Sequence, residues 1–124
     1  MLADIHEERG DAAGARLLLR RAVSALRAQQ SAGVLLNPST MGNLAASLRE
    51  DGDLDLALEL AEAALALSRE RDEDPVSLGI HLRTLAGVHE TRGQLAAADT
   101  RLQEAIALVR EVPGSGQRLL AALL

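Results

Sequence analysis

The sequence predicts an all-α protein in which antiparallel helical hairpins stack into a superhelical array. Three observations predict it: a pattern that recurs three times, apolar residues at helical spacing, and turn or capping residues between the helical intervals. No alternation of apolar and polar residues, which would indicate strands, is found along the chain. Recurrence at this length is typical of arrays in which each hairpin buries its apolar surface against its neighbours.

The recurring pattern is a Leu-Ala pair, a Gly eight residues after that Leu, and two further Ala beyond the Gly. The glycines are Gly10, Gly52 and Gly93, which lie 42 and 41 residues apart. In every copy the first Ala follows the Gly by 5 residues, and the second follows 7 residues later. We therefore expect repeat units over residues 1–37, 38–74 and 75–116, and a helical stub over 117–124.

Each unit is predicted to contain two helices, and the second unit gives the clearest signals. The apolar residues of its first helix form one stripe at i, i+3, i+4 and i+7: Met41, Leu44, Ala45 and Leu48. Asn37-Pro38 is a start signal, Gly52 suits a left-handed helix end, and Asp53 is expected to cap the next helix. Asp74-Pro75 repeats the start signal. The expected helices cover 2–9, 12–30, 38–51, 54–72, 76–92 and 95–111, and a last one begins near 117.

These residues resemble the tetratricopeptide repeat family. The resemblance rests on Leu44-Ala45, Gly52-Asp53, Ala57, Ala61 and Ala64, and on the matching residues of the other copies. It implies a right-handed superhelix whose groove is lined by the first helices and binds peptides or partner helices. The chain departs from the family where aromatic residues are usual, for example at His6, Leu48 and His89. Its longer repeat is similar to kinesin-light-chain-type arrays and to bacterial regulatory arrays.

The composition excludes most catalytic and cofactor chemistry. The 124 residues include no Cys, Phe, Tyr or Trp, and all 13 basic residues are Arg. Thiolates, disulfides, lysine Schiff bases and phosphate-loop lysines are therefore absent. We expect no enzymatic activity, no cofactor and no metal site. A net charge of −5 disfavours nucleic acid and anionic membranes, and with no membrane span or signal peptide expected, we expect a cytoplasmic protein.

By the same resemblance, one side of each first helix would face the groove. The candidate groove residues are Asp4, Glu7, Glu8, Asn43, Arg49, Glu50, Ile80, Arg83 and Glu90. Glu7, Arg49 and Glu90 occupy equivalent repeat positions. They form either a mixed-charge strip that recognises a peptide or a ladder of exposed ion pairs, each worth about 0–1 kcal/mol. A carboxylate clamp for chaperone tails is rejected, because Asp4, Ile80 and Thr84 stand where that clamp needs Asn or basic residues.

The remaining polar residues carry less specific signals. His6, His81 and His89 are interpreted as packing or hydrogen-bonding residues, with Asp74 and Glu90 as potential partners of His81. The acidic clusters are interpreted as helix ends and solvated turns. Ser115 lies in a Pro- and Gly-rich loop with no base in the pattern, so it is not expected to act as a nucleophile.

The two ends of the chain suggest an array that extends further. Met1 enters in the middle of a first helix, and no fourth Leu-Ala pair appears before Leu124, so we expect a fragment of a longer array. The apolar stub is expected to pack in its own groove, against its own last hairpin, or on another chain. The main prediction is a non-catalytic protein or peptide interaction scaffold. The alternative is homodimerisation through the terminal helices, with these candidates: Leu119, Leu120, Leu123 and Leu124.

Overall fold

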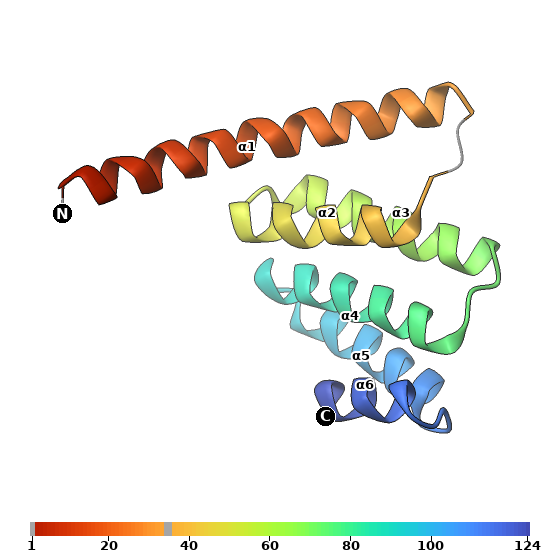
Figure 1. Ribbon diagram of the computed structural model, residues 1–124. Coiled ribbons are helices and arrows are strands. Elements are labelled where there is room, and N and C mark those ends of the chain that lie inside the picture. The colour runs from red at the N-terminus through yellow and green to blue at the C-terminus, as the bar shows by residue number, and fades with distance from the viewer. Residues whose placement is uncertain (1, 34–35) are drawn as a thin grey trace. The chain divides into compact units, whose positions relative to one another are not determined.

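A computed structural model of the chain describes residues 2–33 and 36–124, and over these residues it contains six helices and no strand. Side chains are described from Gly14 onward, apart from Ala15, Arg16, Val34, Leu35 and Ser115. The helices are α1 (Leu2–Ser31), α2 (Pro38–Asp51), α3 (Leu54–Glu70), α4 (Pro75–Thr91), α5 (Leu95–Val109) and α6 (Ser115–Leu123) (Figure 1). The all-α prediction is confirmed. The chain divides into two compact units, Met1–Leu36 and Asn37–Leu124.

The first unit consists of α1, and its continuity corrects the hairpin turn expected at Gly10. The helices predicted over 2–9 and 12–30 are one helix of 30 residues. A glycine inside a helix costs only about 1 kcal/mol relative to alanine, whereas a break gives up hydrogen bonds that helix–helix packing must replace. Residues 2–9 amount to about two turns and offer little surface for such packing. Ala12 and Ala13, strong helix formers, then continue the helix.

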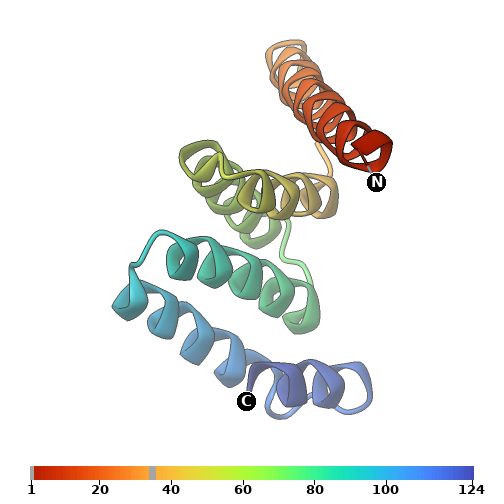
Figure 2. The same ribbon diagram turned by 90° about the vertical axis from the view of Figure 1, so that its left-hand side faces the viewer.

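The second unit consists of two antiparallel hairpins, α2–α3 and α4–α5, followed by α6 (Figures 1 and 2). Helix α4 packs on both α2 and α3, and α6 packs on both α5 and α4. The last helix therefore extends the row in which α2 and α4 are the earlier members. The bounds of α2 are those predicted, and those of α3 to α6 agree with the prediction within 2 residues.

The two hairpin turns share one hydrogen-bond pattern. Gly52 has φ of 90° and donates to the carbonyl of Arg49, and Asp53 donates to the carbonyl of Leu48. Gly93, with φ of 80°, and Gln94 repeat both bonds one hairpin later. This left-handed Schellman ending requires a positive φ that glycine adopts without strain.

The expected helix starts are only partly confirmed. Asn37 caps α2, since its Oδ1 accepts a hydrogen bond of 2.9 Å from the Ser39 amide. Asp53 and Asp74 occupy N-cap positions, but neither side chain forms a capping hydrogen bond. The start of α3 depends instead on the turn that ends α2, because that turn already fixes the direction of the chain.

Alanines fill the interior of the hairpins, as the repeat pattern predicts. Ala45 and Ala57 are 0% exposed, and Ala86 and Ala98 are also buried. Small side chains at these positions allow two helix backbones to approach at the short end of the usual 8–10 Å range. Larger residues complete the core of the second unit: Leu48, Leu82, Leu85, Val88 and Val109.

Candidate functional site

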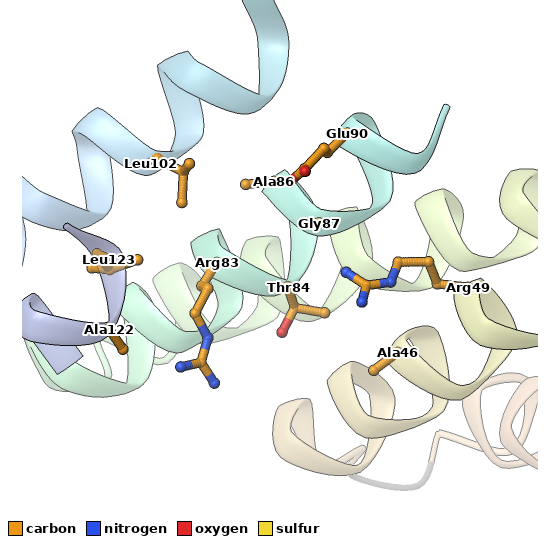
Figure 3. Close-up of a pocket in the computed structure, with 10 residues that line it drawn as sticks. All are labelled: Ala46, Arg49, Arg83, Thr84, Ala86, Gly87, Glu90, Leu102, Ala122 and Leu123. Atoms are coloured by element: carbon orange, nitrogen blue, oxygen red, sulfur yellow. The ribbon is translucent and has the colours of Figure 1, made fainter. Parts of the chain in front are cut away.

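The second unit contains a hollow of about 420 Å³ over the first helices of its hairpins. Helix α2 contributes Ala46 and Arg49, and α5 contributes Leu102. The residues from α4 and α6 are Arg83, Thr84, Ala86, Gly87, Glu90, Ala122 and Leu123. Figure 3 shows the two arginines on either side of Thr84, with Leu102 and Leu123 close together at one end. The hollow therefore combines cationic groups with an apolar wall.

Arg49 is half-buried because its side chain crosses from α2 onto the backbone of α4. A Cβ atom at Gly87 would collide with the Arg49 Nη1 atom, so the guanidinium lies where only a glycine leaves room (Figure 3). Among the residues that the structure describes, no acidic group forms an ion pair with Arg49. The half-buried charge is thus left without a countercharge, an arrangement that favours an anionic ligand.

Arg83 brings a second positive charge to the same hollow. It lies one helical turn before Gly87 on α4 and is exposed, again with no ion-pair partner among the described residues. The hydroxyl of Thr84, between the two arginines, donates to the carbonyl of Ile80 at 3.1 Å. Because the hydroxyl proton of Thr84 already forms this hydrogen bond, it is not available to a ligand in the hollow. Glu90 supplies the one carboxylate of the lining, toward the C-terminal end of α4.

The structure brings together three of the predicted groove residues, Arg49, Arg83 and Glu90. Asn43 and Ile80 line a smaller neighbouring hollow of about 110 Å³, and Thr84 borders both. Glu50 is exposed and lines neither. The side chains of Asp4, Glu7 and Glu8 lie outside the described residues, as do those of His6 and Ser115. A groove that includes the first copy therefore stays a prediction.

Among the described residues, neither Arg49 nor Glu90 forms an ion pair, so no ladder between first helices is formed there. Two of the ion pairs that the second unit does contain involve the second helices of the hairpins. Arg69 of α3 pairs with Glu104 of α5 at 3.2 Å, and Arg92 after α4 pairs with Asp55 of α3.

The sequence offers packing of the stub in its own groove as one outcome, but it does not name Leu102 as a groove residue. Leu123 is a predicted self-association residue, but in the structure it is half-buried beside Leu102. The repeat spacing could have predicted this position of the stub. A shift of 41 residues aligns α6 with the start of α4, so α6 corresponds to the first helix of a further hairpin. Leu119 is 7% exposed, Leu120 is half-buried, and Leu124 is 84% exposed. The stub thus packs mainly on its own last hairpin, one of the three outcomes expected for it.

Two of the three histidines have the hydrogen-bonding or packing roles expected of them. His89 is half-buried, and its Nδ1 atom lies 2.8 Å from Oε1 of Gln94. His81 is 4% exposed, and its Nε2 atom lies 3.8 Å from Oε1 of Glu73, a partner that the sequence analysis does not name. Burial lowers the pKa of His81, and the carboxylate of Glu73 offsets part of that effect.

The part of the chain that the structure describes holds no group of three His, Asp or Glu residues able to bind a metal ion. None of its helices is both long and apolar enough to cross a membrane.

One comparison with known proteins agrees with the fold of the second unit. The family model described as tetratricopeptide repeat matches residues 36–111, which span both hairpins of the second unit. No curated protein and no solved structure matches the chain significantly. The match covers more than half of the chain and includes Arg49, Arg83 and Glu90.

Proposed function

The chain belongs to the tetratricopeptide repeat family, whose repeats generally mediate protein–protein interactions, and from that premise we propose that it is a non-catalytic module that binds an acidic peptide segment of a partner protein. The hollow along α2 and α4 is the proposed binding site. The observation that carries the proposal is the pair Arg49 and Arg83, which lack ion-pair partners among the described residues. No step of the proposal requires a catalytic group.

The chemistry of the hollow defines the ligand. Guanidinium groups bind carboxylates through charge-assisted hydrogen bonds, each worth about 1.5–3 kcal/mol when one partner is charged. We therefore expect a Glu or Asp side chain of the partner to bind the guanidinium groups of Arg49 and Arg83. An apolar side chain next to it would cover Leu102 and Leu123 and remove their exposed surface from water. Glu90 disfavours a second acidic residue at its end of the hollow.

Charge reversal tests the proposal directly. The probes are short labelled peptides that combine Leu with Glu, with Gln or with Lys in the same order. We expect the Glu peptide to bind and the double variant Arg49→Glu/Arg83→Glu to weaken that binding by about a hundredfold or more, because two charged hydrogen bonds are lost. Fluorescence anisotropy measures the affinity.

The matched control is Arg71→Glu/Arg110→Glu, which changes the net charge equally at two exposed positions outside the hollow. This control should bind the Glu peptide as the unmodified chain does. Equal binding of the Glu, Gln and Lys peptides, or equal loss in both double variants, would contradict the proposal.

Self-association through the terminal helices is the alternative. Leu124, 84% exposed, is the observation in its favour, whereas Leu119 already packs within its own unit. Light scattering with refractive-index detection measures the molar mass, since a chain without Trp or Tyr absorbs too weakly at the usual wavelength. A dimer that Leu124→Glu converts to a monomer would favour the alternative, and a monomer at all concentrations would exclude it.

A further inference from the structure

Two side chains cross the junction between α2 and α4 in opposite directions, and each ends on a glycine. Arg49 of α2 lies against Gly87 of α4. His81 of α4 lies against Gly42 of α2, where a Cβ atom would stand 3.2 Å from the His81 Nδ1 atom. Both contacts depend on the spacing between the same two helices, so a change at His81 is expected to alter the position from which Arg49 reaches the hollow.

His81 is held on its other side by a carboxylate. Its Nε2 atom lies 3.8 Å from Oε1 of Glu73, and that oxygen accepts a hydrogen bond from the buried Ser68 hydroxyl of α3. Glu73 is the titratable group that faces His81 among the described residues, and α2 meets the ring at Gly42. Helices α5 and α6 meet α4 at Gly79, through the apolar side chains of Val109 and Leu119.

The junction suits the neutral imidazole and not the charged one. With its proton on Nε2, the ring points a donor toward Glu73 and a lone pair toward Gly42. The Nδ1 atom is buried and has no hydrogen-bond partner among the described residues. A second proton would place a charged N–H group there without an acceptor, and a buried, unsatisfied charged donor is costly.

We infer that protonation of His81 loosens the junction between α2 and α4, and so weakens the binding of acidic ligands at Arg49 and Arg83. The statement about the ligand rests on the proposed function, whereas the loosening of the junction does not. The module would release an acidic partner when the surroundings become mildly acidic, through a group beneath the binding residues.

The direction of the pH effect follows from the burial of His81. Its pKa in the folded chain is lowered from the usual 6.5. The unfolded chain therefore takes up the proton first, and the stability contributed by neutral His81 is present above pH 6.5 and lost as the pH falls toward the folded value. Stability and ligand affinity should both decrease on acidification.

A distance measurement tests the loosening without any ligand. The chain has no cysteine, so Ser47→Cys in α2 and Gln103→Cys in α5, both exposed, place one spin label on each hairpin. Pulsed electron paramagnetic resonance should give a broader or longer distance distribution at about pH 5.5 than at about pH 7.5. His81→Gln should remove this difference, and His89→Gln, the matched control, should keep it.

Proton NMR of the imidazole in the unlabelled chain shows whether His81 is protonated over that range. An unchanged distance distribution while His81 is protonated would overturn the inference. So would an imidazole that stays neutral down to about pH 5.

Binding of the Leu/Glu peptide completes the test. The dissociation constant should rise severalfold between about pH 7.5 and 5.5, where the carboxylates of the peptide remain mostly ionised, and His81→Gln should remove most of that rise. If the peptide binds at neither pH while the distance changes, the proposed function fails and the loosening stands. If it binds with the same pH dependence in the unmodified chain and in His81→Gln, the pH inference fails and the function stands.

Discussion

The segments around Gly10 and Gly52 have the same repeat spacing and different structures. Gly10 lies inside the continuous helix α1, whereas Gly52 ends α2 in a left-handed turn from which α3 begins. The turn at Gly52 follows a helix of 14 residues with its own N-cap and buries alanines on both sides. A glycine thus permits a turn, and the packing of two sufficiently long helices makes the turn the stable choice.

The largest expected effect contrasts the same residue type in the two units. Leu48 is 1% exposed in α2, so Leu48→Ala should lower the free energy of unfolding by about 2–5 kcal/mol. Leu18 is 65% exposed in α1, and Leu18→Ala should change the stability by no more than about 0.5 kcal/mol. Denaturant titration followed by far-UV circular dichroism measures both. Comparable losses would show that α1 has a core of its own.

A smaller effect is expected at one repeat position in two copies. Ala64 is 1% exposed in α3, so Ala64→Leu should overpack the hairpin and cost about 1–3 kcal/mol. Ala22, its counterpart in α1, is exposed, and Ala22→Leu should be close to neutral. Thermal unfolding of the two variants measures the difference. Equal shifts in Tm would mean that both copies pack as hairpins.

The smallest expected effect is the change in unfolding free energy when glycine is replaced by alanine, and its sign should differ between Gly52 and Gly10. Gly52 has φ of 90°, and a methyl group added there would extend into open space, so Gly52→Ala should cost about 1–2 kcal/mol from backbone strain alone. Gly10→Ala should gain about 0.5–1 kcal/mol, because alanine is the better residue inside a helix. Unfolding curves of the two variants give the signs. A loss at Gly10 would restore the turn that the repeat pattern predicts there.

The elements of the second unit could be predicted because their signals are local. Asn37-Pro38, Gly52 and Gly93 act through hydrogen bonds to residues at most five positions away. Helical spacing then sets which alanines face inward. The absence of a turn at Gly10 depends instead on how much surface the flanking helices can pack. The spacing of a motif carries no information about that surface.

The candidate site could be predicted in part for the same reason. Arg49, Arg83 and Glu90 follow from helical periodicity combined with the family resemblance. The contacts of Arg49 with Gly87 and of His81 with Gly42 depend on the offset between two helices that are far apart in sequence. The contribution of Leu123 depends on where α6 packs. Such offsets arise from the whole set of packing contacts, and no single segment encodes them.

The glycines inside α2 and α4 limit how far the hairpins can be treated as interchangeable modules. A shift of 41 residues takes Gly42 to Arg83, and the reverse shift takes Gly87 to Ala46, so neither receiving position recurs in the other hairpin. Duplicating the first hairpin would set Arg49 against Ala46, whose methyl group would make the flexible guanidinium shift, and duplicating the second would set His81 against Arg83. The contacts at Gly42 and Gly87 therefore depend on the order of the two hairpins, although the backbones of the hairpins are alike.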